Sequence, residues 1–463
     1  SVFVNSFLYD LLPDGWLKEP ETRDYNCVGL AVNTAISLLE AYGSNELSRV
    51  LVFMGGPGTI GEGKIVGTDL KETIRNYVDF EKGNSNTKYY KAACEFYEKL
   101  SQRASLCGII IDIFSCCLNQ VGLYEMKNLP SKTGGYMIFT DSFSTMIFKD
   151  SLRKIFELDD NGILKMNFKA RLSFNCTQNY KVCGALGHLL SLQKKSPLVS
   201  DIVIGEGNTC EWLLGGLSPT STYSFFLDCN DQLKNANKLC IIKLLTTYIA
   251  GDGSTRLRVS TTSRKICSSL EMSNMLTEIG NSFDQEAASV LIARMCVDKS
   301  FKGEDSKESL KWIDKTLIHL MSHFAKYFKG NPNSFKLTSQ FNYFPQFMFY
   351  LRRSSFIQNF TESPDESTYY KFLLLAETVQ NCTIMIQPLL FEYTPDNPSP
   401  NPVYLDLNSL KNDCVLLLDT FFHVVVWHGN NVAEWREKGY QDQEGYKNIK
   451  QMLEDPQDYA QNI

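Results

Sequence analysis

The first third of the chain alternates between two hydrophobic patterns. Some stretches repeat apolar residues every three or four positions, which is the spacing of a helix with one buried face. Others are short, nearly continuous apolar runs bounded by glycine or polar residues, which is typical of buried strands. The helical stretches are residues 26–39, 90–104 and 121–128, and the strand-like runs are Arg49–Met54, Gly108–Phe114 and Gly135–Phe139. This alternation predicts an α/β domain with a largely parallel sheet covered by helices on both faces.

The predicted α/β domain covers residues 1–157 and ends with a helical stretch at Ser151–Phe156. The sequence before Arg49 contains no strand-like run that could start the sheet. We therefore expect this domain to be incomplete on its N-terminal side.

The pattern changes from residue 158 onward. Short segments of alternating hydrophobicity follow one another, for example Met166–Asn175, Tyr223–Leu227 and Arg256–Thr262. Turn residues separate these segments about every dozen positions, which is the spacing expected for an all-β domain. Residues 158–267 are therefore predicted to form a β-barrel or β-sandwich.

Helical spacing returns near residue 268. Residues Phe283, Ala287, Val290 and Ala293 share one side of a predicted helix, and a second helix begins near Trp312. Residues 268–374 are therefore predicted to form a helical domain.

The last part of the chain again mixes strands and helices. The run IMIQPLLFEY at residues 384–393 is strand-like, the run Val415–Trp427 is strongly apolar, and residues 432–438 have helical spacing. Residues 375–463 are therefore predicted to form a terminal α/β module. The fold class as a whole is multidomain, with α/β, all-β and all-α parts.

Composition narrows the range of functions. The chain has 463 residues, too many for one hydrophobic core, so several domains are expected. Its net charge of −6 argues against broad nucleic-acid binding, which needs basic surface to neutralise phosphates. None of the 14 cysteines forms a CxxC pair, so a zinc knuckle or a dithiol redox site is not predicted. No apolar window reaches the length of about 20 residues that a membrane span needs. A cytosolic chain with reduced cysteines and no cofactor is expected.

A glycine-rich segment at Gly58–Lys64 (GTIGEGK) matches the GxxxxGK pattern after a predicted buried strand. A phosphate-binding loop of this type needs Ser or Thr after the lysine to bind Mg²⁺, followed by a helix whose amides hold the phosphates. Here Ile65 follows the lysine, and Gly67 interrupts any helix that begins there. We favour a surface loop and keep a nucleotide-binding enzyme as the alternative function.

Two histidines, His319 and His323, lie one helical turn apart, so both imidazoles could bind one metal ion. The residues between them supply no general base, and no third ligand is evident. Ordinary helix histidines are the favoured interpretation. Neither a GxSxG segment nor another nucleophile–base pattern is present, so we predict no active site in this chain.

Basic residues near the end of the predicted β domain form a candidate anion-binding surface. Arg256, Arg258 and Arg264 all occupy even positions of one predicted strand, and Lys265 is adjacent. Successive side chains on one strand face are ~7 Å apart, a spacing that suits lipid phosphates. A solvated strand face explains the same residues equally well, and both interpretations stay open.

A second basic pair, Arg352-Arg353, ends the aromatic run Tyr343–Leu351. These arginines could complement a helix C-terminus, while the neighbouring aromatic residues suit a protein interface. Core packing is the favoured role of the aromatic residues.

Several longer strings carry a resemblance to a known family. The most specific are SFDQEAA at 282–288 and LRRSSF at 351–356, and others are spread over nearly the whole chain. They are FMGGP at 53–57, GLYEM at 122–126, TGGYM at 133–137, DSF at 141–143, GLSP at 216–219, SPDESTYY at 363–370, DTFFH at 419–423 and WREKGYQDQ at 435–443. In these strings and in their order, the chain resembles the GTPase-activating subunit of the COPII inner coat.

The resemblance implies a von Willebrand A-like trunk, a β-barrel or sandwich, a helical domain and a gelsolin-like module. It implies a coat protein of endoplasmic reticulum exit sites and COPII vesicles, which works by binding and has no active site of its own. The implied partners are a small GTPase in its GTP form, the cargo-binding inner-coat subunit, the outer-cage subunits and an anionic membrane surface, with no nucleic acid.

The family's zinc finger, its early barrel strands and the first half of its trunk have no counterpart among these residues, so structural zinc is expected only outside them. The family's catalytic arginine finger is likewise expected beyond Ile463, so no catalytic residue is assigned. Candidate partner contacts are Arg352, Arg353, Phe421, His423 and Trp435, and candidate membrane contacts are Arg256, Arg258, Arg264 and Lys265.

Overall fold

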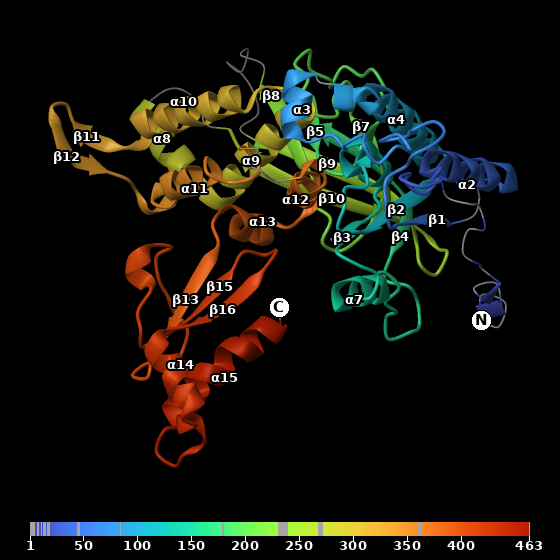
Figure 1. Ribbon diagram of the computed structural model, residues 1–463. Helices are drawn as coiled ribbons and strands as arrows, with labels where there is room; N and C mark the ends of the chain where they lie inside the picture. Colours follow the sequence, from blue (N-terminus) through green and yellow to red (C-terminus); the bar gives the residue numbers. More distant parts are fainter. Residues whose placement is uncertain are drawn as a thin grey trace.

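The computed structural model describes residues 19–43, 47–83, 85–177, 180–229, 239–266, 272–358 and 363–462, together with residues 5, 6, 9, 10, 12 and 15. Figure 1 shows three parts packed side by side and a fourth part that extends away from them. The α/β domain and the β domain lie together, the helical domain lies beside them, and the C-terminal module extends from the helical domain.

The α/β domain is built on three parallel strands, as the sequence predicts, and their order in the sheet is β1-β2-β3. The central strand β2 is buried at every residue. The single helix predicted over residues 121–128 is two short helices, because Pro130 lacks the N–H that would bond to the Met126 carbonyl. The elements are α2 (Val28–Tyr42), β1 (Ser48–Met54), α3 (Tyr77–Lys82), α4 (Tyr90–Leu106), β2 (Ile109–Cys116), α5 (Leu123–Met126), α6 (Asn128–Thr133), β3 (Met137–Thr140) and α7 (Met146–Ile155).

The two faces of this sheet are covered differently. Ile109, Ile111 and Ile113 pack against residues of α2 and α4, as expected for a helix-covered face. On the other face Ile110 packs against Met166 and Phe168 at the start of the β domain. The prediction that helices cover both faces is therefore wrong in part, because a strand of the next domain takes part of that position.

The β domain is a sandwich of two antiparallel sheets. One sheet has the order β10-β9-β4-β7-β6, and the other contains β5 and β8. Leu172, Phe174 and Trp212 of the first sheet pack against Val182 and Phe225 of the second. The strands are β4 (Asn167–Cys176), β5 (Tyr180–Leu186), β6 (Leu190–Ser191), β7 (Glu211–Leu217), β8 (Ser224–Cys229), β9 (Leu239–Ala250) and β10 (Thr255–Lys265).

The helical domain has a core formed largely by α9, with Val290, Ala293 and Val297 against Ile313 and Phe344. Side-chain caps start its longer helices, for example Asp284, which accepts a hydrogen bond from the Ala287 N–H (3.0 Å). A two-stranded hairpin interrupts the helices. The elements are α8 (Met272–Asn281), α9 (Gln285–Phe301), α10 (Ser306–Phe324), β11 (Lys326–Phe328), β12 (Asn331–Lys336), α11 (Phe344–Leu351), α12 (Pro364–Ala376) and α13 (Val379–Ile386).

The C-terminal module is a four-stranded antiparallel sheet in the order β14-β13-β15-β16, with α14 and α15 against it. The predicted strand over 384–393 is wrong in its first part. Ile384–Ile386 complete α13, whose start is capped by Thr378, and the strand begins only after Pro388. The elements are β13 (Leu389–Tyr393), β14 (Asn401–Pro402), β15 (Val415–Asp419), β16 (Val424–His428), α14 (Asn430–Glu437) and α15 (Lys447–Asn462).

Helix α12 contacts every other part of the molecule. Its Tyr369 ring lies 5.7 Å from Phe139 of the α/β domain, and its Phe372 ring lies 3.9 Å from His188 of the sandwich. Its Tyr370 ring lies 4.3 Å from Phe422 of the C-terminal module. This one helix therefore links all four parts directly.

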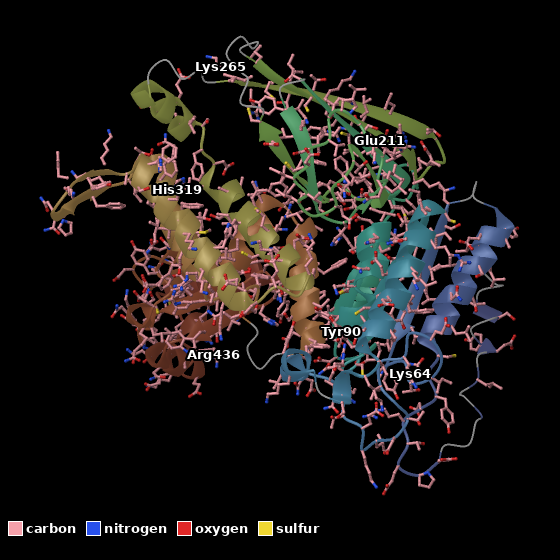
Figure 2. All side chains as sticks on the ribbon, turned by 90° about the horizontal axis from the view of Figure 1, so that it is seen from above. Lys64, Tyr90, Glu211, Lys265, His319 and Arg436 are labelled. Carbon is pink, nitrogen blue, oxygen red and sulfur yellow. The ribbon has the colours of Figure 1, made fainter. Side chains whose placement is uncertain are left out.

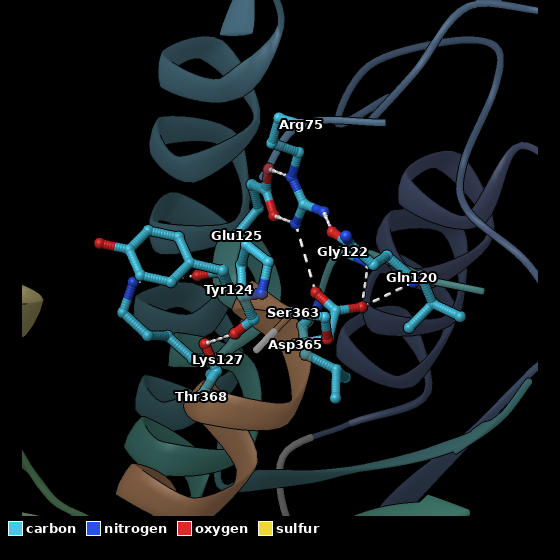
Figure 3. A network of polar contacts seen from close by, with 12 residues as sticks. Arg75, Gln120, Gly122, Tyr124, Glu125, Lys127, Ser363, Asp365 and Thr368 are labelled. Atoms are coloured by element: carbon cyan, nitrogen blue, oxygen red, sulfur yellow. Dashed lines mark hydrogen bonds and ion pairs between the residues drawn. The ribbon is translucent and has the colours of Figure 1, made fainter. Parts of the chain in front are cut away.

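At the start of α12, a buried polar network joins the helical domain to the α/β domain (Figure 3). The Asp365 carboxylate accepts hydrogen bonds from the N–H groups of Val121 (2.6 Å), Gly122 (2.9 Å) and Leu123 (3.0 Å) at the start of α5. It also pairs with Arg75 at 3.3 Å. Arg75 in turn forms a two-pronged pair with Glu125. We call these residues the Asp365 network.

The charges of this network are fully removed from water, since Arg75 and Glu125 are each 1% exposed and Asp365 is 0% exposed. Burial by itself lowers the pKa of Arg75, but the two facing carboxylates outweigh it and raise that pKa overall. The guanidinium therefore stays charged inside the protein, where it faces Glu125 and Asp365.

Two further contacts join the sandwich to the helical domain. The Arg294 guanidinium on α9 donates to the Ser224 hydroxyl (3.0 Å) and to the carbonyls of Leu374 (2.9 Å) and Glu377 (2.6 Å). The His188 Nε2 lies 3.1 Å from the Phe372 carbonyl. Burial lowers the pKa of His188 to about 3, and the nearby Arg294 charge acts in the same direction.

The substitution Asp365→Asn is expected to destabilise the protein by about 3–5 kcal/mol, because it leaves Arg75 buried with one partner fewer and turns an amide group toward backbone N–H donors. Asp305→Asn is the matched control, since Asp305 caps α10 at the surface and Asn caps equally well. Urea unfolding measures both variants, and hydrogen exchange at residues 121–123 reports the contact directly. Equal effects of the two substitutions would contradict a central role for Asp365.

Stability is expected to fall with acid through His188. Because its folded pKa is about 3 and its unfolded pKa about 6.5, the unfolded chain binds more protons below pH 6.5. The wild type should therefore lose about 2 kcal/mol more than His188→Gln between roughly pH 7 and pH 5. Urea midpoints at the two pH values give the difference. His319→Gln, at an exposed histidine of α10, is the matched His→Gln control.

Candidate functional surfaces

Strand β10 carries the predicted basic surface. It pairs with β9 in unbroken antiparallel register from Thr255 to Lys265, and all of its residues are exposed. The strand alternation places Arg256, Arg258 and Arg264 on one face, as predicted. The same alternation places Lys265 on the opposite face.

Two of the three arginines of β10 have polar neighbours within the protein. Arg256 pairs with Asp252 at 2.8 Å, and Arg264 donates to the Thr262 hydroxyl at 2.9 Å. The ion pair of Arg256 is exposed and therefore weak, so it can exchange for another anion at little cost. The outer surface of β10 is therefore basic and open to solvent.

The glycine-rich segment Gly58–Lys64 is a loop without a following helix, since α3 begins only at Tyr77. The N–H groups of Ile65 (2.8 Å) and Val66 (3.4 Å) both donate to the Gly58 carbonyl. The Lys64 ammonium lies 4.1 Å from the centre of the Tyr89 ring. These amides and this lysine have partners within the protein, so the loop lacks the form of a phosphate-binding loop, and the alternative of a nucleotide-binding enzyme gains no support.

The two histidines of α10 are exposed and close to each other, with ring centres 4.5 Å apart. The His323 Nδ1 lies 2.8 Å from the His319 carbonyl, a contact within the same helix. In the described part of the chain, no group of three or more His, Cys, Asp or Glu side chains is arranged to hold a metal ion.

Arg352 and Arg353 lie at the end of α11. The Arg352 Nε pairs with Asp314 of α10 at 2.9 Å, and the Arg353 guanidinium lies 3.7 Å from the centre of the Phe349 ring. Phe344, Phe347 and Met348 of the same helix are buried in the core. Phe344 and Phe347 therefore pack inside, as expected, whereas Tyr343 and Phe349 of the same run are exposed, and both arginines remain at least partly exposed at its end.

The DTFFH segment is the tight connection between β15 and β16. Phe421 adopts a left-handed backbone conformation (φ 70°), and its N–H donates to Asp419 at 2.8 Å. Phe421 and Phe422 pack against the helical core, whereas His423 is exposed. Phe421 thus holds the module on the helical domain, and within this segment His423 is the residue open to a partner.

Trp435 on α14 is half-buried against the core of the C-terminal module. It also borders an open hollow of about 470 Å³ together with Pro395, Tyr440 and Tyr446. The rings of Tyr440 and Tyr446 are stacked 5.2 Å apart. Trp435 therefore has an exposed edge in an aromatic surface.

The candidate residues do not converge on one site. Lys64, Lys265, His319 and Arg436 lie on separate parts of the molecule (Figure 2). Sequence reasoning missed Arg75, Asp365 and His188, the buried groups that join the domains. The only signal in the sequence was the placement of Asp365 inside the SPDESTYY string.

The fold defines a multidomain protein whose four parts all contact α12, and most of its candidate groups, Phe421 excepted, are at least partly exposed. Among the described residues, no helix is both long enough and apolar enough to cross a bilayer.

Comparison with known proteins identifies the family. Residues 3–156 match the Sec23/Sec24 trunk domain, residues 167–267 the Sec23/Sec24 beta-sandwich domain, and residues 284–384 the Sec23/Sec24 helical domain. The chain is also similar in fold to the crystal structure of the human COPII-coat protein Sec24c, with a TM-score of 0.67 and 15% identity. That match covers 88% of this chain and 50% of the Sec24c chain.

The chain belongs to the Sec23/Sec24 family. The predicted multidomain fold, with its trunk, β-sandwich and helical domain in this order, is confirmed. The chain spans half the length of the Sec24c chain that it matches. The exact domain boundaries and the candidate contact residues stay predictions.

Proposed function

We propose that this chain is part of the GTPase-activating subunit of the COPII inner coat, which acts in vesicle transport from the endoplasmic reticulum to the Golgi. The observation that carries the proposal is the match of three successive domains to the Sec23/Sec24 family. The strings SFDQEAA and LRRSSF support the choice of the GTPase-activating subunit within that family. The chain then acts as a cytoplasmic scaffold, peripheral on exit sites and vesicles, without a cofactor.

The proposed partners are the small GTPase of the coat, the cargo-binding inner-coat subunit, the outer cage and an anionic membrane surface. A scaffold for several partners needs its surfaces held in fixed relative positions, and the contacts of α12 with all four parts supply such positions. Exposed His423 and partly exposed Arg352, Arg353 and Trp435 are candidate contacts for protein partners.

GTPase activation requires a guanidinium that reaches the phosphates of the partner's nucleotide, a contribution of roughly 10³–10⁵ in rate. Arg352 pairs with Asp314, Arg353 lies over Phe349, and Arg436 lies 3.2 Å from His428. We assign the arginine finger of the full-length protein to none of these three.

Two measurements test this proposal. Size-exclusion chromatography should show co-elution of the chain with the purified cargo-binding inner-coat subunit. Single-turnover hydrolysis by the GTP-loaded small GTPase should accelerate by less than about tenfold at saturating chain, well below full activation. Co-elution with the GTPase-activating subunit instead would place the chain in the other branch of the family. Strong acceleration that Arg436→Ala or Arg353→Ala abolishes would overturn the assignment of the finger.

The anionic membrane contact is assigned to the arginines of β10. If Arg256, Arg258 and Arg264 meet lipid phosphates, each should contribute about 1 kcal/mol near the surface, and the effect should fade as salt screens it. Flotation with phosphatidylserine-containing liposomes compares the wild type with the triple Arg→Ser variant at low and high salt. Recovery should drop for the variant at low salt only. Equal recovery at low salt would remove this surface from the proposal.

A further inference from the structure

The hairpin of β11 and β12 extends from the helical domain away from the rest of the molecule (Figure 1). Three aromatic side chains on it are open to solvent: Tyr327 is 54% exposed, Phe328 78% and Phe335 49%. Soluble proteins rarely group large apolar side chains on a projecting tip, and such patches mark interaction sites. Neither the candidate partner contacts nor the β10 surface includes these residues.

The aromatic side chains are grouped around one hollow. Tyr327, Phe328 and Phe335 border an open volume of about 300 Å³ together with Pro332. The turn that carries them is held by the Ser334 hydroxyl, which accepts from the Phe328 N–H (2.7 Å) and donates to the Asn331 carbonyl (2.6 Å). Gly330 takes a left-handed conformation (φ 87°) at the tip. The hydrogen bonds of the Ser334 hydroxyl therefore shape the turn, and the aromatic rings take no part in them.

The charges of the hairpin have one sign. Residues 325–337 contain Lys326, Lys329 and Lys336 and no acidic residue, in a chain whose net charge is −6. In the described part of the chain, no ion pair within 4 Å involves any of these lysines. A partner that covers the tip must therefore offer negatively charged groups to the lysines and apolar surface to the neighbouring aromatic rings.

We propose that the β11–β12 hairpin is a membrane contact, with its aromatic side chains inserted into the interfacial layer of an anionic bilayer and its lysines on the lipid phosphates. Aromatic rings favour the headgroup level of a bilayer, and lysine stems bury their methylenes while the ammonium stays in the polar layer.

The distribution of exposure favours a bilayer over a protein groove. All residues of β11 and all but one of β12 are exposed, so the tip is open on both faces. A protein groove would cover mainly one face of a two-stranded ribbon, whereas a bilayer surrounds an inserted tip on every side. The hairpin lies in the helical domain and β10 in the sandwich, so their contributions should be separable.

The test is sedimentation of the chain with vesicles of phosphatidylcholine, alone or with roughly one-third phosphatidylserine. The aromatic variant replaces Tyr327, Phe328 and Phe335 by Ser, and the lysine variant replaces Lys326, Lys329 and Lys336 by Gln. The lysine variant should lose about fivefold in affinity per lysine at low salt and show a smaller salt dependence. The aromatic variant should lose roughly tenfold or more at low and at high salt, since apolar insertion is not screened.

The matched control is Tyr404→Ser with Leu407→Ser, two side chains that are 75% and 83% exposed in the C-terminal module. It should bind vesicles like the wild type, and all variants should keep the wild-type thermal midpoint because the changed side chains are exposed. The proposal is overturned if the aromatic variant binds like the control, or if the wild type binds neither kind of vesicle. It is equally overturned if the triple Arg→Ser change on β10 removes all binding while both hairpin variants retain it.

Discussion

The burial of one carboxylate, Asp365, is the constraint on which the arrangement of the domains depends. A charge at 0% exposure is tolerated only where every lone pair finds a donor, and Asp365 finds three backbone N–H groups and the Arg75 guanidinium. The donors belong to the α/β domain and the acceptor to the first turn of α12. Separation of the two domains would expose or orphan these charges, so the interface has one favourable geometry.

Helix α12, which contains Asp365, also contacts the sandwich and the C-terminal module. Along α12, Tyr369 contacts the α/β domain, Tyr370 the C-terminal module and Phe372 the sandwich. A change of position in one part therefore disturbs contacts with the next, because the aromatic rings of neighbouring residues on one helix cannot move independently. Surfaces on different domains of this chain are therefore held in fixed relative positions.

The positive charge of this acidic chain is concentrated in local surface patches. The chain is acidic overall, yet β10 and the β11–β12 hairpin are both basic and both exposed. At physiological salt a charge acts over roughly 8 Å, so an anionic partner responds to these patches and not to the net charge. The hairpin adds aromatic surface to its lysines, and β10 does not present aromatic side chains. The two surfaces should therefore differ in how far salt weakens their contacts.

The sequence alone determined the order of the elements, because the spacing of apolar and polar residues within a short stretch distinguishes a helix from a strand. It placed the parallel strands, the sandwich, the helices α9 and α10, and the shared face of Arg256, Arg258 and Arg264. The sequence prediction assigned Ile384–Ile386 to a strand because a short apolar run fits either element. Packing against α9 stabilises these residues as the end of a helix.

Only the tertiary structure showed that Asp365 contacts Arg75, that His188 contacts Phe372, and that Phe421 packs inward. These partners lie far apart in the chain. A local sequence pattern therefore cannot predict which buried polar group will form a hydrogen bond or an ion pair with which other group.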